Sequence, residues 1–170
     1  MKLSIVIGAL ALLVLAGGHA GACSFPDPPH FEAIAPTAKR IFVFQVLTLQ
    51  YHRDGNAAEW VEGKIKVVEN FRGDATEMTS VHFSNRFCGG LRLDVGHSYL
   101  VATNITSNPL RFELGDETVR DISLEYNPSW PEPVRTSAVL QRLIRALNND
   151  GSFADVLGDQ YLALTRPSPE

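Results

Sequence analysis

Apolar and polar residues alternate along much of the chain, and this alternation predicts a series of β-strands. Two long segments, residues 40–51 (RIFVFQVLTLQY) and 60–73 (WVEGKIKVVENFRG), are rich in the β-branched and aromatic residues that favour strands. In the first segment, the residues expected on one face are Ile41, Val43, Leu47, Leu49 and Tyr51. In the second, charged residues alternate with Val61, Ile65 and Val67, so we expect one face of this strand to be solvated.

Four shorter segments continue the pattern towards the C-terminus. We expect a short strand at 79–85 and an apolar, central strand at 97–105 (HSYLVATNI). Residues 110–114 and 118–126 are candidates for two more strands. Five or six short strands separated by turn residues predict a mostly β fold, either a barrel or a sandwich.

The two ends of this β region follow other patterns. Residues 136–148 have helical periodicity, with Thr136 or Ser137 as the N-terminal cap and Gly151 as the end signal. The apolar face of this predicted helix consists of Val139, Leu140, Leu143, Ile144 and Leu147. Residues 23–37 contain four prolines, so we expect them to be extended and irregular.

Residues 1–22 have the organisation of a signal peptide. Lys2 precedes an apolar run, and the residues at 20–22 (AGA) have the A-x-A form that a signal peptidase accepts. The run is shorter than the stretch of about 20 apolar residues that spans a bilayer. We therefore expect no transmembrane segment in the mature chain. Cleavage after Ala22 would leave 170 − 22 = 148 residues, 23–170, as one secreted or periplasmic domain.

The mature chain is weakly acidic. Lys2 is the only Lys, Arg, Asp or Glu in the leader, so 14 Lys plus Arg remain against 19 Asp plus Glu, a net charge of −5. Binding to a nucleic-acid backbone needs a basic surface. We therefore expect no nucleic-acid partner, and the composition does not indicate an oligomeric state.

Two cysteines, Cys23 and Cys88, are candidates for covalent chemistry. Export would place both in an oxidising compartment, where an even number of cysteines favours a disulfide. Cys23 directly follows the predicted cleavage site, so two other roles are open for it. It is a candidate lipid anchor, although AGAC is a poor lipoprotein signal because Ala20 stands where Leu is usual. It is also a candidate N-terminal residue that acts through its free amine.

The other polar residues form no recognisable catalytic or metal-binding motif. The histidines after the leader are His30, His52, His82 and His97. None of them has the H-x-H or H-E-x-x-H spacing of metal ligands, and two cysteines are too few for a cysteine zinc site. There is no G-x-S-x-G nucleophile motif. We therefore expect no metal, no cofactor and no enzymatic activity.

The order of several short motifs resembles the netrin-like domain family, whose best-known members are the tissue inhibitors of metalloproteinases. The motifs are a cysteine followed by prolines (CSFPDPP), a strand (AKRIFVFQV), a strand end (VVENFRGD), a turn (FCGG) and a second strand (GHSYLVAT). Each motif is short, and the resemblance rests on their order between residues 23 and 105. The chain departs from the inhibitors at Phe25, where they have a second cysteine.

This resemblance implies a fold, a disulfide and a candidate site. The fold is a five-stranded antiparallel barrel of the oligonucleotide/oligosaccharide-binding (OB) type, with the C-terminal helix packed on it, over residues 23–170. The implied disulfide joins Cys23 to Cys88. In the inhibitors, the amine and carbonyl of the first cysteine chelate the zinc of the protease, and the next residue enters its specificity pocket. Carried over, these roles fall on Cys23 and Ser24.

The function expected from these observations is a secreted or periplasmic binding module that recognises a protein partner. One alternative is an inhibitor of a metalloprotease that acts through Cys23 and Ser24. The other is a surface lipoprotein anchored at Cys23. The barrel type also suggests oligosaccharide or nucleic-acid binding, for which Trp60 and Tyr51 are candidate stacking residues.

Overall fold

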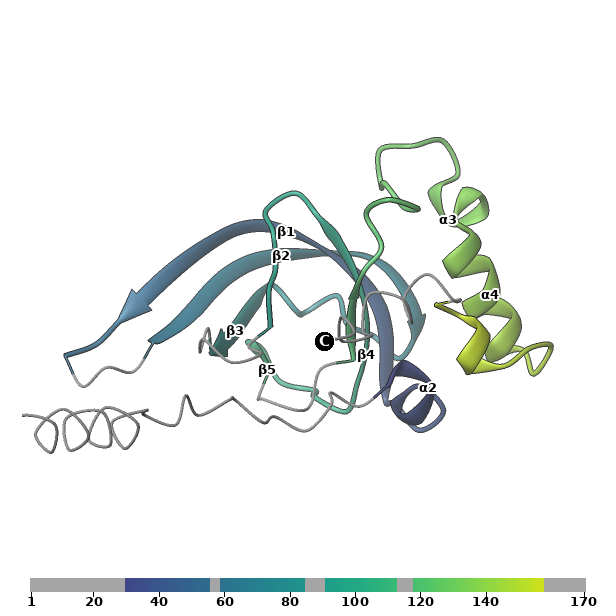
Figure 1. The fold of residues 1–170 in the computed structure, drawn as a ribbon, viewed down its shortest axis with the longest axis horizontal. Helices are drawn as coiled ribbons and strands as arrows, with labels where there is room; N and C mark the ends of the chain where they lie inside the picture. Colours follow the sequence, from purple (N-terminus) through teal and green to yellow (C-terminus); the bar gives the residue numbers. More distant parts are fainter. Residues whose placement is uncertain (1–29, 56–58, 85–90, 113–117, 158–170) are drawn as a thin grey trace, which may run out of the picture.

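The fold is known from a computed structural model of the chain, in which a curled β-sheet carries short helices at one side (Figure 1). The described residues are 30–55, 59–84, 91–112 and 118–157. Six strands in these residues form one sheet, in the order β5-β3-β2-β1-β4-β6. The strands are β1 (Arg40–Arg53), β2 (Glu59–Arg72), β3 (Ser80–Ser84), β4 (Ser98–Thr103), β5 (Leu110–Phe112) and β6 (Val119–Asp121). The prediction of a mostly β fold is confirmed, and every predicted strand segment contains a strand.

The sheet is mixed, which corrects the predicted antiparallel arrangement. β3 and β5 run parallel, with Val81 opposite Leu110 and Phe83 opposite Phe112. The other neighbouring pairs are antiparallel. β4 follows β3 in the chain and runs in the opposite direction, so it returns the chain to the end of the sheet from which β3 starts. The prediction of five antiparallel strands is therefore not matched exactly, because the sheet has six strands and one of its pairs is parallel.

The curled sheet separates two hydrophobic clusters, one on each face of β1 and β4. The inner cluster, inside the curl, takes from these strands Phe42, Phe44, Tyr99 and Val101. The outer cluster, which the helices cover, takes from them Ile41, Val43, Leu100 and Ala102. Because both faces of β4 are covered, all of its residues are buried, as expected for a central strand.

β1 does not keep one apolar face along its length, which corrects the face predicted from alternation. Residues 41–44 are all buried, because these four side chains alternate between the two clusters. The pairing of β1 with β2 then shifts register between Val46 and Thr48. Leu47, at this shift, is 45% exposed and Tyr51, beyond it, is 50% exposed, although alternation places both on one face with the buried Ile41 and Val43. An extra residue of this kind is a β-bulge, which turns the following side chains.

The predicted C-terminal helix is confirmed as α4 (Ala138–Leu147). Its buried residues Val139, Leu140 and Leu143 pack in the outer cluster, so the helix lies against the sheet. Ser137 caps the helix, because its Oγ accepts a hydrogen bond from the backbone N–H of Leu140 at 3.3 Å.

Three details around this helix differ from the prediction. A separate short helix, α3 (Pro133–Thr136), precedes α4, so Thr136 does not cap α4. The chain turns at Asn149 in the left-handed conformation (φ 59°), two residues before Gly151. Residues Phe31–Ile34 form one helical turn, α2, inside the segment expected to be extended. A 3₁₀ turn follows α4 at Phe153–Asp155.

None of the helices in the described ranges has both the length and the apolar character needed to cross a membrane.

Candidate functional site

The residues to which the resemblance assigns a function, Cys23, Ser24 and Cys88, lie outside the described residues. The disulfide, the inhibitory role of the N-terminal amine and the lipid anchor therefore stay predictions. The described residues do contain the two candidate stacking residues, the ends of the long β1–β2 hairpin, and the loop before β4.

Trp60 and Tyr51 do not share a surface. Trp60 stands opposite His52 in the β1–β2 pair, whereas Tyr51 stands opposite Val61. Neighbouring residues of a strand point to opposite faces of the sheet, so the two rings lie on different faces. The Trp60 ring stacks on His52 with ring centroids 5.3 Å apart, and its Nε1 donates to Glu62 at 3.2 Å. The two aromatic residues therefore do not form one stacking platform for a ligand.

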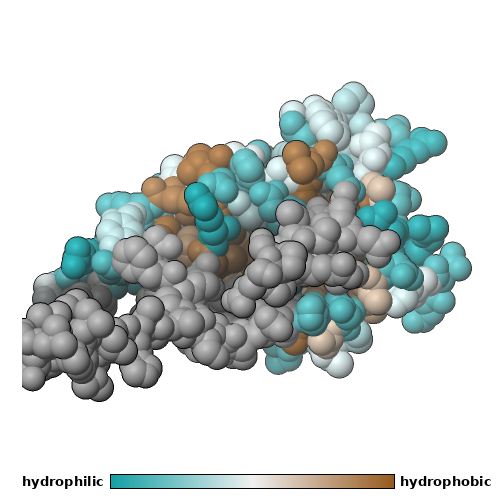
Figure 2. All heavy atoms as spheres, viewed as in Figure 1, coloured by the Kyte–Doolittle hydropathy of each residue, from teal (hydrophilic) through white to brown (hydrophobic). Residues whose placement is uncertain are grey.

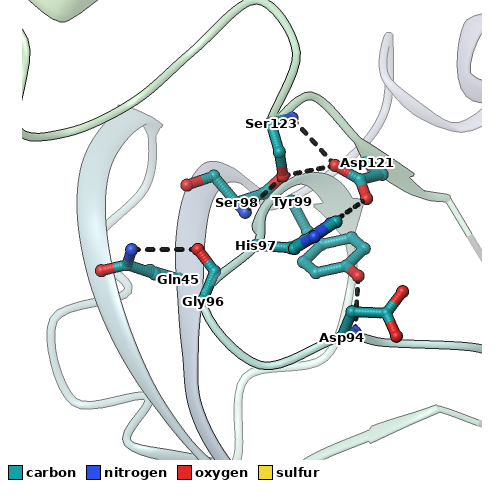
Figure 3. A network of polar contacts seen from close by, with 8 residues as sticks. All are labelled: Gln45, Asp94, Gly96, His97, Ser98, Tyr99, Asp121 and Ser123. Carbon is teal, nitrogen blue, oxygen red and sulfur yellow. Dashed lines mark hydrogen bonds and ion pairs between the residues drawn. The ribbon is translucent and has the colours of Figure 1, made fainter.

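A polar network joins the start of β4 to the end of β6 (Figure 3). Nδ1 of His97 lies 2.7 Å from Oδ2 of Asp121. The hydroxyl of Ser123 donates to Oδ1 of the same carboxylate at 2.5 Å and accepts a hydrogen bond from the backbone N–H of Ser98 at 2.9 Å. The network therefore ties the residues that precede β4 to the residues that follow β6.

This network contains a serine, a histidine and an aspartate, but their order does not activate a nucleophile. In a catalytic triad the serine hydroxyl is hydrogen-bonded to the histidine, which takes its proton. Here the hydroxyl of Ser123 is bonded to Asp121 instead. Sequence reasoning treated His97 as an isolated residue, and the only local signal of the network is the D-I-S spacing of Asp121 and Ser123.

The network shifts the pKa values of its members in directions that favour an ion pair. The hydrogen bond to Asp121 raises the pKa of His97 above its ordinary value. Partial burial acts to raise the pKa of Asp121, but hydrogen bonds from His97 and Ser123 outweigh it and hold that pKa below the ordinary value. Burial raises the pKa of the neighbouring Tyr99 to about 12, so its hydroxyl is protonated at neutral pH.

The same region fixes the loop that leads into β4. The backbone N–H of Asp94 donates to the hydroxyl of Tyr99 at 2.7 Å, and the side chain of Gln45 donates to the carbonyl of Gly96 at 3.1 Å. The backbone N–H of Gly96 donates to the carbonyl of Val46 at 2.8 Å. Gly96 has a positive φ of 87°, a conformation that glycine adopts without strain. The chain therefore turns away from β1 at this point.

One edge of β1 is open beyond this turn, within the part of the chain that the structure describes. β4 pairs with Arg40–Gln45, and the last backbone hydrogen bonds on that side involve Val46. Along its other edge β1 stays paired with β2 as far as Arg53. Thr48 and Gln50 in this stretch are exposed. Among the described residues, 47–53 therefore form a strand edge that is paired on one side only.

Three exposed apolar residues lie on this edge or next to it. Leu47, Tyr51 and Val95 are 45%, 50% and 57% exposed. Val95 directly precedes Gly96, which is bonded to Val46, so it lies beside the start of the open edge. Figure 2 shows a hydrophobic area above β1 and the loop that leads into β4. We call these three residues, together with the half-buried Leu49, the β1 edge strip.

Sequence reasoning missed the β1 edge strip. Leu47 and Tyr51 were expected on the same face as Ile41 and Val43, and Val95 had no distinguishing pattern around it beyond the glycine that follows. Among the described residues, no group of three or more His, Cys, Asp or Glu side chains is placed to hold a metal ion.

Comparison with models of known protein families gives no match, and no curated protein matches the chain in sequence. The conclusions about function that follow therefore rest on the fold and on the surface.

Proposed function

We propose that the chain is a netrin-like binding module, secreted or periplasmic, that recognises a protein partner through the β1 edge strip. The observation that carries this proposal is that Leu47, Tyr51 and Val95 are exposed on or next to the stretch of β1 that pairs on one side only among the described residues. Apolar residues that gather on a surface mark interaction sites more often than apolar residues that are scattered singly.

The sheet topology supports the OB-type barrel that this proposal includes. Leu110 and Phe112 of β5 and Val119 of β6 all belong to the inner cluster, although β5 and β6 are opposite edges of the sheet. The curl therefore brings both edges to one core. β5 pairs with β3, β6 pairs with β4, and six residues separate them in the chain. Taken as two halves of one interrupted strand, they are the fifth strand of a five-stranded barrel.

A capture experiment tests the binding function. The full secreted chain is immobilised and incubated with the extracellular proteins of its source, and bound proteins are quantified by mass spectrometry. The double variant Leu47→Asp, Val95→Asp places two charges on the strip and should lose the partner, because a charge is costly to bury in an apolar contact. Trp130→Asp is the matched control, since Trp130 is 44% exposed, close to the 45% of Leu47, and lies in the loop before α3.

The control variant should retain the partner at the wild-type level. Circular dichroism and thermal unfolding first establish that all three proteins are folded. Identical sets of bound proteins on wild type and on the double variant would show that the strip does not bind the partner.

A further inference from the structure

We propose that residues 47–53 of β1 bind an extended segment of the partner protein as an added β-strand. The proposal rests on the function proposed above, because it specifies how the same surface holds a protein partner. The chain before β4 turns away from β1 at Gly96. The added strand lies next to β1 beyond this turn, in the position that β4 would occupy if it were longer.

The edge at residues 47–53 has hydrogen-bonding capacity for another strand. An edge strand presents N–H and C=O groups from alternate residues, and another extended chain can pair with them. In the described part of the chain, residues 47–53 pair with β2 on one side only. Protein edges are commonly protected against strand addition by charged residues, Pro or β-bulges. In residues 47–53 (LTLQYHR) the register shift lies at the start and the charged Arg53 at the end, and residues 49–52 between them contain no Lys, Arg, Asp, Glu or Pro.

The two faces of the sheet beside this edge differ in chemistry. Leu49 and Tyr51 stand opposite Gly63 and Val61, and Val61 belongs to the inner cluster, so they lie on the concave face. The residues between them on the convex face are polar, namely Thr48, Gln50 and His52. A strand added at this edge continues both faces of the sheet. Its side chains should therefore alternate, apolar towards the concave face and polar towards the convex face.

Arg53, the only Lys, Arg, Asp or Glu within residues 47–53, is paired and so does not act as a free charge that would select an acidic partner. Arg53 and Glu59 form an ion pair, with Nε of Arg53 3.5 Å from Oε1 of Glu59. The nearby carboxylate of Glu59 also raises the pKa of Tyr51 above its ordinary value. The Tyr51 ring is therefore positioned at the edge and neutral, so apolar contact is the interaction it offers.

The size of the edge favours a segment of another protein over a second copy of this chain. Seven residues, 47–53, at about 3.3 Å each form an edge roughly 23 Å long, and a sheet is about 10 Å thick. Two identical edges would therefore bury on the order of 460 Å² in total. Stable specific dimers bury about 1,200 Å² or more. The edge fits the transient binding of an extended peptide, in which main-chain hydrogen bonds supply much of the affinity.

A peptide selection followed by an N-methyl scan tests the proposal. Peptides of twelve random residues, displayed on phage, are selected on the full secreted chain. Each selected peptide is then synthesised with a single backbone N-methyl group at each position in turn, and its Kd is measured by fluorescence anisotropy. An N-methyl group removes a donor and blocks close approach of two strands. Kd should therefore rise about tenfold at every second position and change little between them.

Hydrogen exchange locates the binding site in the same complex. Backbone amides within 47–53 should exchange more slowly when the peptide is bound, because added pairing protects them. An N-methyl scan without a period of two, or protection elsewhere in the chain, would overturn strand addition. The binding function would still stand if the Leu47→Asp, Val95→Asp variant loses its captured partner.

Two further outcomes also overturn the proposal. One is a library that yields no binder. The other is protection of 47–53 in the absence of peptide that rises with protein concentration, because it would identify a second copy of the chain as the occupant of this edge.

Discussion

The pair formed by His97 and Asp121 makes the stability of the fold depend on pH. The pKa of His97 lies above its ordinary value of 6.5 because of the hydrogen bond to Asp121. Protonated His97 therefore stabilises the fold below about pH 6.5, and this contribution is lost as the pH rises through the raised pKa. The pKa of Asp121 lies below 3.8, so its contribution is present above that pH and is lost as the pH falls through the lowered pKa.

We therefore predict that His97→Gln destabilises the protein more at pH 5.5 than at pH 8. Both side chains are more than 40% exposed, so the contribution of the pair is expected to be about 1 kcal/mol or less. Urea unfolding of wild type and variant at the two pH values measures the difference. In an Asp121→Asn background the same His97 substitution should show a smaller dependence on pH. If His97→Gln lowers the free energy of unfolding by the same amount at pH 5.5 and at pH 8, the prediction is contradicted.

At the scale of single residues, the sequence predicts contacts between residues close in the chain better than contacts between residues far apart in it. His97 and Asp121 are separated by 24 positions, and the pairing of Tyr99 with Asp121 in the sheet is what brings them together. No local pattern contains that information. Ser137 could be predicted as a cap because its partner, Leu140, is three residues away.

At the scale of elements, the alternation of residues located the strands but not their faces. The charged face predicted for β2 is present, because Glu62, Lys64 and Lys66 are exposed between more buried neighbours. β1 differs because its first half is buried on both faces and a register shift follows at Val46–Thr48. A sequence in which both faces are apolar does not indicate where a bulge lies. The open edge at 47–53 depends on that geometry and so could not be predicted.

The close approach of β1 and β2 at Gly63 gives a prediction about this hairpin. A Cβ at Gly63 would lie 2.7 Å from the carbonyl oxygen of Thr48 and 2.7 Å from Cδ2 of Leu49. The leucine side chain can move, but the Thr48 carbonyl belongs to the backbone of β1. We expect Gly63→Ala to lower the free energy of unfolding by about 1–3 kcal/mol through overpacking.

Gly55, at the end of the same hairpin, supplies the matched control. A Cβ added there meets no atom of the described residues within 4 Å, so Gly55→Ala should change the free energy of unfolding by no more than about 0.5 kcal/mol. Urea unfolding followed by circular dichroism measures both variants. Equal urea midpoints for the two variants would show that β1 and β2 accommodate a Cβ at Gly63 without a loss of stability.

At the scale of the whole molecule, composition and period predicted a mostly β domain with a C-terminal helix on the sheet, and both are found. The parallel pairing of β3 with β5 was not predicted. It depends on the route of the chain through β4, which local pattern does not encode. The two hydrophobic clusters explain why the helix is needed: the outer faces of β1 and β4 are apolar and α4 covers them.

The last prediction concerns the attachment of the N-terminal segment to this domain. The even cysteine count after an export signal, and the resemblance to the netrin-like family, predict a disulfide between Cys23 and Cys88. Closing a loop of this length should stabilise the fold by roughly 4 kcal/mol. Cys23→Ser and Cys88→Ser should then each lower the unfolding free energy, and the double variant should lose no more than either single variant, because each substitution removes the same bridge. Intact-mass measurement after alkylation, with and without reductant, detects the bridge directly. Two thiols alkylated without reductant, or an acyl group on Cys23, would exclude it, and additive losses in the two single variants would assign the cysteines separate roles.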